Sequence, residues 1–156
     1  MRSILSQLKE ELLSWPHVSA HPHRFGGQEF RFDKAEVGHV HFWGALDIPF
    51  PRAIRDALLE SRLAEVHHWV PDSGWVTFRV RGADNLEHAV WLMRLSYLRY
   101  ALKTVADPLE FLKHESAQLR LNSTIASLLA RHAPANKVYG TPRNPAAALA
   151  AGPQQA

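Results

Sequence analysis

The chain has 156 residues, of which 46% are hydrophobic, and this suffices for one domain with its own core. It contains no cysteine, which excludes disulfides, thiolate catalysis and cysteine-ligated zinc. The net charge of +3 permits nucleic-acid binding without arguing for it, and no apolar run approaches the roughly 20 residues of a membrane span, so we expect a cytoplasmic protein with no membrane partner.

Hydrophobic residues recur at helical spacing near the N-terminus and alternate at strand spacing further on. Leu8 and Leu12 belong to an amphipathic helix that Pro16 ends. Residues 17–27 contain Pro22 and a glycine pair, which favour a loop. The patterns predict, in order, a helix over 2–14, strands over 28–32 and 37–43, a helix over 51–62, strands over 64–70 and 74–80, and helices over 84–103 and 107–131.

Turn and capping residues support this order of elements. Pro49 and Pro51 are expected to stop strand pairing before the second helix. Residues 71–74, Pro-Asp-Ser-Gly, have the chemistry of a tight turn between the third and fourth strands. Asp84 and Asp107 each precede a carboxylate by three residues, which is the spacing of a helix N-terminus.

Strands that arrive as hairpins form an antiparallel sheet, so the sequence predicts an α+β fold. We expect a four-stranded sheet built from two hairpins, in the order α-ββ-α-ββ-α, with helices mainly on one face. Residues 1–106 would form this single domain, and residues 107–133 an extra C-terminal helix that packs on the domain or on a partner. The Pro/Ala-rich tail, residues 134–156, is expected to be disordered.

The alternation of the strands predicts one polar and aromatic sheet face. Side chains two residues apart lie on the same face of a strand, and the other face of each strand is apolar and suited to burial under helices. Three tryptophans on an open sheet face indicate a contact surface, because exposed aromatic patches usually mark binding sites. The predicted ligand-binding residues are His39, His41, Trp43, His67, Trp69, Trp75, Thr77 and Arg79.

Two histidines on this face have the spacing of metal ligands. His39 and His41 would share one strand face, and His67 could supply a third imidazole to a divalent metal ion. Asp47 and Glu65 are the nearest candidate carboxylates. The alternative is that these imidazoles hydrogen bond to nearby polar groups or pack on the tryptophans. The loop histidines of His21-Pro-His23 could be a second pair of metal ligands or, with Arg24, an anion contact, but the simplest interpretation is that they have no role.

Several stretches resemble the bacterial luciferase-domain family. They are Pro22-His-Arg-Phe-Gly-Gly-Gln-Glu-Phe-Arg31, Gly38-His-Val-His41, Asp47-Ile-Pro-Phe-Pro51, Pro71-Asp-Ser-Gly-Trp-Val76 and Arg94-Leu-Ser-Tyr97, within about residues 16–103. This family is largely uncharacterised, and the resemblance implies neither light emission nor an established catalytic residue. More distantly, the strand Gly74-Trp-Val-Thr-Phe78 before a helix with Ser96-Tyr97 is similar to MmcQ/YjbR-type domains, which would imply a compact α+β fold and a proposed role in DNA binding.

Three functional hypotheses follow. The first is a domain that binds a small anionic or aromatic molecule on the His/Trp/Arg face. The second is a nucleic-acid- or protein-binding module of the MmcQ/YjbR type. The third is a metal-dependent enzyme that uses His39 and His41. The C-terminal helix could close a monomer or join two copies in a homodimer.

Overall fold

The computed structural model describes residues 3–135 as an α+β fold with a six-stranded antiparallel sheet. The strands are β1 (Val18–Pro22), β2 (Gln28–Phe32), β3 (Ala35–Val40), β4 (Ala45–Pro49), β5 (Glu65–Val66) and β6 (Trp75–Arg79), and their order in the sheet is β1-β2-β3-β4-β6-β5. The helices are α1 (Ile4–Leu13), α2 (Arg52–Glu60), α3 (Leu86–Ala101), α4 (Pro108–Gln118) and α5 (Ser123–Ala130), with a short 3-10 turn, η1 (Ala83–Asn85), before α3. The predicted disordered tail lies, except for residues 134 and 135, outside the described residues.

The antiparallel α+β architecture is confirmed, but the expected count of four strands is wrong. The segment predicted as a loop contains β1, which pairs with β2 at the edge of the sheet. An edge strand tolerates Pro22 because its outer side needs no ladder hydrogen bonds. Strand β4 likewise contains a proline, Pro49. Because β3 pairs with β4 only as far as His39 opposite Asp47, Pro49 interrupts no hydrogen bonds between these two strands.

Two predicted strands are shorter than expected, each for a local reason. The strand expected to reach Trp43 ends at Val40, because His41 begins a turn in which the Gly44 amide donates to the His41 carbonyl at 2.9 Å. In the segment expected to be a strand over 64–70, the His67 Nδ1 atom accepts from the backbone amides of Trp69 and Val70 at 3.1 and 3.2 Å. Such side-chain bonds offer the backbone an alternative to the ladder.

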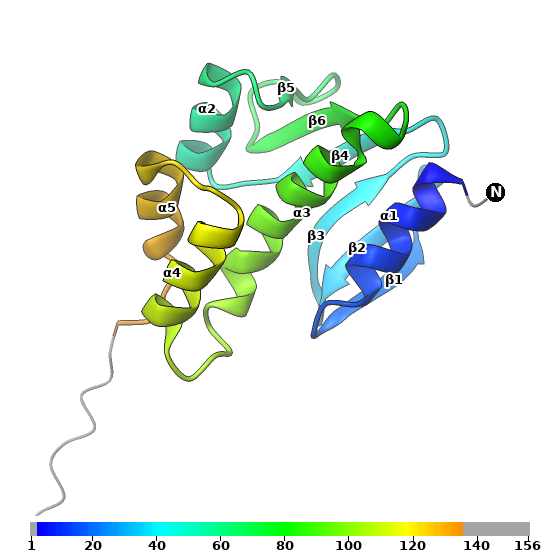
Figure 1. The fold of residues 1–156 in the computed structure, drawn as a ribbon. Coiled ribbons are helices and arrows are strands. Elements are labelled where there is room, and N and C mark those ends of the chain that lie inside the picture. The colour runs from blue at the N-terminus through cyan, green and yellow to red at the C-terminus, as the bar shows by residue number, and fades with distance from the viewer. Residues whose placement is uncertain (1–2, 136–156) are drawn as a thin grey trace, which may run out of the picture.

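Helices α1 and α3 lie across one face of the sheet (Figure 1). The core is built there from alternate strand residues and the inner helix faces, and Leu46, Ile48, Leu92 and Leu98 are fully buried. Gly38 lets α3 approach closely, since a Cβ at this position would lie 2.7 Å from the Met93 sulfur.

The predicted last helix is two helices, α4 and α5, separated where Arg120 takes a positive φ. The N-cap at Asp107 is confirmed, because its carboxylate accepts from the Glu110 amide. Leu112, Ile125 and Leu129 are buried in the common core, and α5 packs against α2 (Figure 1). The described part of the chain contains no helix long and apolar enough to cross a membrane.

Candidate functional site

A row of polar residues crosses the centre of the sheet on the face opposite α1 and α3. The pairing register places His39 on β3 opposite Asp47 on β4, and Asp47 opposite Thr77 on β6. Their strand neighbours Leu46, Ile48 and Val76 point into the core. Because side chains alternate along a strand, these three residues point the other way.

Asp47 is the centre of this row and is completely buried. Its Oδ1 atom accepts a 2.5 Å hydrogen bond from the Thr77 hydroxyl. Its Oδ2 atom lies 3.1 Å from His41 Nε2 and 3.5 Å from the Nε2 atoms of both His39 and His67. Burial raises the pKa of the Asp47 carboxyl, but the hydrogen bonds from His39 and Thr77 outweigh it and lower the pKa to about 2. Asp47 is therefore a carboxylate that orients three imidazoles.

His39 lies between two carboxylates and is 7% exposed. Its Nδ1–H donates to Glu36 Oε1 at 2.6 Å, and its Nε2 faces Asp47. Burial lowers the pKa of His39, but the hydrogen bonds to Asp47 and Glu36 outweigh it and raise the pKa to about 9. A pKa of about 9 favours a His39 ring that carries a proton on both nitrogens at neutral pH.

His67 is held in one tautomer by the backbone. Since its Nδ1 atom accepts two amide N–H groups, the ring proton is on Nε2, which faces Asp47. Burial lowers the pKa of His67 even though the Asp47 charge raises it, which favours the neutral ring. This arrangement suits a hydrogen-bond partner of Asp47 better than a metal ligand, because a ligating imidazole usually donates its other N–H.

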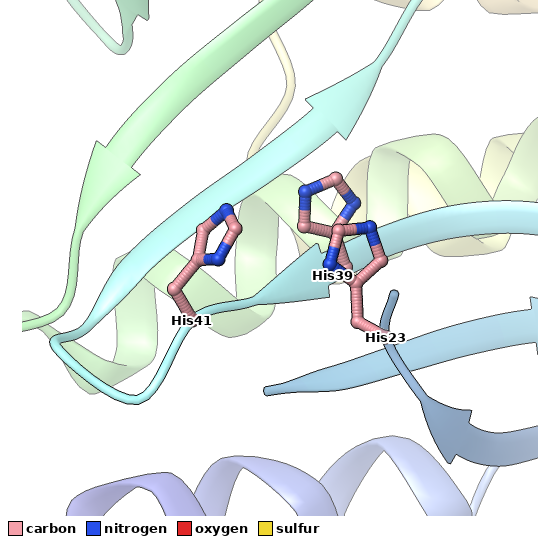
Figure 2. Close-up of side chains that lie close together, drawn as sticks. All are labelled: His23, His39 and His41. Atoms are coloured by element: carbon pink, nitrogen blue, oxygen red, sulfur yellow. The ribbon is translucent and has the colours of Figure 1, made fainter. Parts of the chain in front are cut away.

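A group of three histidines lies beside this row of polar residues. His23, in the turn after β1, His39 and His41 each offer a ring nitrogen, and these atoms lie within 4.8 Å of one another. Figure 2 shows that the three rings lie close together, although they come from β3 and from the turns after β1 and β3. The His23 ring stacks on His39 at a centroid distance of 3.7 Å and meets His41 edge-on at 5.5 Å.

Two nitrogens of this group are buried without a partner among the described residues. They are His23 Nδ1 and His41 Nδ1. His41 Nε2 faces the Asp47 carboxylate at 3.1 Å and donates to it, so in the neutral ring Nδ1 carries the lone pair. Burial, and next the neighbouring His39, lower the pKa of His23. Buried polar atoms are normally satisfied, so two unpaired imidazole nitrogens in one cluster require an explanation.

A cavity of about 670 Å³ opens beside the cluster. His39 and His67 lie at its inner side, and Trp69, Trp75 and Phe25 supply apolar walls. Phe25 and Trp69 meet edge-to-face at 6.1 Å across its rim. The other lining residues are Pro22, His23, Arg24, Glu29, Arg31, Glu36 and Val70.

The structure brings most of the predicted site residues together. Trp43 stacks on His41 at 4.3 Å but is 60% exposed and lies outside the cavity lining. Thr77 is buried beneath Asp47 and does not line the cavity either. Arg79 is at the other end of β6, where its Nε lies 3.9 Å from a Glu65 carboxylate oxygen. Arg79 and Glu65 are not among the residues that line the cavity.

Sequence reasoning did not identify His23, Glu36, Glu29 or Arg31 as site residues. His23 lay in a segment predicted as a loop and was not included in the predicted site, whereas Pro22 and the glycine pair occur at the tip of the β1–β2 hairpin. Asp47 was placed after a strand, although the alternation of Leu46, Asp47 and Ile48 is typical of a strand.

A family model described as the Luciferase domain matches residues 34–96. The resemblance to luciferase-domain proteins is thus confirmed, over a segment that holds β3, β4, β6, His39, His41, Asp47 and His67. Neither the curated proteins nor the solved structures contain a match to this chain.

Proposed function

We propose that this chain, whose residues 34–96 resemble the Luciferase domain, binds a divalent transition-metal ion through His23, His39 and His41. The observation that carries the proposal is the pair of buried, unpaired nitrogens, His23 Nδ1 and His41 Nδ1, within one three-histidine group. An ion at this group would satisfy both. Imidazole nitrogen is a preferred donor for Zn²⁺, Cu²⁺, Fe²⁺ and Ni²⁺.

The outer partners of the cluster support this ligand set. Glu36 accepts from His39 Nδ1, which would leave Nε2 to the ion, and Asp47 accepts from His41 Nε2, which leaves Nδ1. Carboxylate–histidine–metal arrangements of this kind fix the tautomer and orientation of the ligand. His39 would lose its Nε2 proton, and His23 would rotate out of its stack on His39 to direct Nδ1 at the ion.

Three protein nitrogens leave at least one coordination position open, as in catalytic metal sites. His23 and His39 both line the cavity, so an open position would face it. A bound ion can lower the pKa of a water molecule or polarise an oxygen of a ligand. We propose that the ion holds a small molecule in this cavity, with Trp69 and Trp75 packing on its apolar part.

The nucleic-acid hypothesis receives less support from the site. Among the described lining residues, Arg31 is paired with Glu29, so Arg24 is the one positive charge left to meet a phosphate backbone. Arg79, which was expected to contribute positive charge, lies away from the cavity. The proposed metal centre therefore ranks above a nucleic-acid interface.

Metal content of the purified, tag-free protein tests the proposal, with the metal measured by mass spectrometry in wild type and in single variants. We expect near-stoichiometric metal in wild type, and its loss in His23→Gln and His41→Asn. His21→Gln is the matched control, since His21 lies on the same hairpin, hydrogen bonds to Ser19 and is outside the cluster.

His67→Gln separates the new ligand set from the one predicted by sequence, His39, His41 and His67. Retention of metal in His67→Gln together with loss in His23→Gln would support the set proposed here. The reverse result would support the sequence-based set. A folded wild-type protein that takes up neither Zn²⁺ nor Co²⁺ on dialysis would refute both.

A further inference from the structure

The charges that line the cavity define which ligand it would favour. Glu29 is paired with Arg31, whose Nε lies 2.6 Å from Glu29 Oε1. Glu36 is paired with His39. Among residues 3–135, Arg24 is the lining residue with a full charge and no ion pair, and its guanidinium lies over the Phe25 ring at 4.8 Å.

A divalent ion would not leave the cluster strongly positive. Asp47 and Glu36, both hydrogen bonded to the ligating imidazoles, would balance its two charges, and Glu29 balances Arg31. Arg24 then remains as one uncompensated positive charge beside the cavity. A ligand with a single negative charge would make the site neutral, whereas a dianion or a cation would not.

The apolar walls of the cavity set a second requirement for the ligand. Trp69, Trp75, Phe25 and Val70 present apolar surface to the same cavity. Trp69 and Phe25 are each more than half exposed, at 60% and 56%, so their rings are not already covered by the protein. A ligand with an apolar body would bury this surface, and the removal of apolar area from water would favour its binding.

We infer that the cavity takes a monocarboxylic acid with an apolar body, its carboxylate toward the metal-facing inner side and its apolar part between the aromatic walls. This inference rests on the proposed metal centre. Arg24, at the rim beside Phe25, attracts the acid and favours the charged form over a neutral analogue. The cavity volume of about 670 Å³ lies within the usual range of small-molecule binding pockets.

Octanoate and octanamide form a matched pair of probes, because they differ in charge but hardly in shape. Binding is measured by calorimetry on Co²⁺-loaded protein whose metal content has been determined in the same preparation. We expect octanoate to bind at least about tenfold more tightly than octanamide, and Arg24→Gln to reduce this ratio. Arg81→Gln is the control, since Arg81 is not a lining residue and its ratio should equal that of wild type.

The possible outcomes distinguish a failure of this inference from a failure of the proposed metal centre. Metal-loaded protein that binds the acid and the amide equally, or binds neither, overturns the inference while the metal centre stands. Protein that takes up no metal refutes the metal centre, and the inference falls with it. Selective octanoate binding that is lost in Trp75→Ala and weakened in Arg24→Gln supports the inference, and binding unaffected by both variants overturns it.

Discussion

Raising the pH of the metal-free protein from about 6.5 to 9 is expected to reduce its stability through His39. The pKa of His39 rises from 6.5 to about 9 on folding, since its hydrogen bonds to Asp47 and Glu36 outweigh the effect of burial. A group whose folded pKa is raised contributes stability that is fully present below its unfolded pKa. That contribution is lost as the pH rises through the folded pKa.

The magnitude follows from the shift and the burial of the ring. His39 is 7% exposed, so solvent screens its ion pairs only weakly. A shift from 6.5 to about 9 corresponds to a loss on the order of 3 kcal/mol as an upper limit. The lowered pKa values of His23 and His67 act in the opposite direction, since their unfolded rings still bind protons near pH 6.5, but this effect is small and ends about one pH unit above 6.5.

Urea unfolding in the presence of a chelator measures the effect at several pH values. We expect the free energy of unfolding to fall between pH 6.5 and 9 in wild type and to change little in His39→Asn. Glu36→Gln should show an intermediate slope, because it keeps a hydrogen-bond acceptor for Nδ1 but removes one of the two charges. A wild-type curve parallel to that of His39→Asn would refute the assignment of a charged His39 between two carboxylates.

Two substitutions test contacts that support the site, and both are measured by urea unfolding of the metal-free protein. Thr77→Val removes the buried hydroxyl that donates to Asp47 and should cost about 1–3 kcal/mol, and a cost near zero would mean that this hydrogen bond does not form. Gly38→Ala should cost about 1–3 kcal/mol, because its Cβ would lie 2.7 Å from the Met93 sulfur at a φ of 153°, and an unchanged midpoint would contradict this close approach.

The sequence by itself determined the α+β fold class and named several residues that the structure brings together in the candidate site. Alternation placed His39 on the polar face of a strand, and turn chemistry located the Pro71–Gly74 segment, where Ser73 Oγ donates to the Val70 carbonyl at 2.6 Å. These features are local: strand period and turn preference depend on residues only a few positions apart. The grouping of His39, His41 and His67 followed from the strand faces, although His67 reaches Asp47 from a turn and not from a strand.

Only the tertiary structure decided which charges and nitrogens meet. Asp47 became the centre of the site because sheet order places β4 between β3 and β6, and strand order is not encoded in any local pattern. His23 reached the cluster because β1 pairs with β2 and carries its turn toward His39. The number of strands, the stacking of His23 on His39 and the approach of His67 to Asp47 depend on contacts between residues far apart in the chain, where packing overrides local preference.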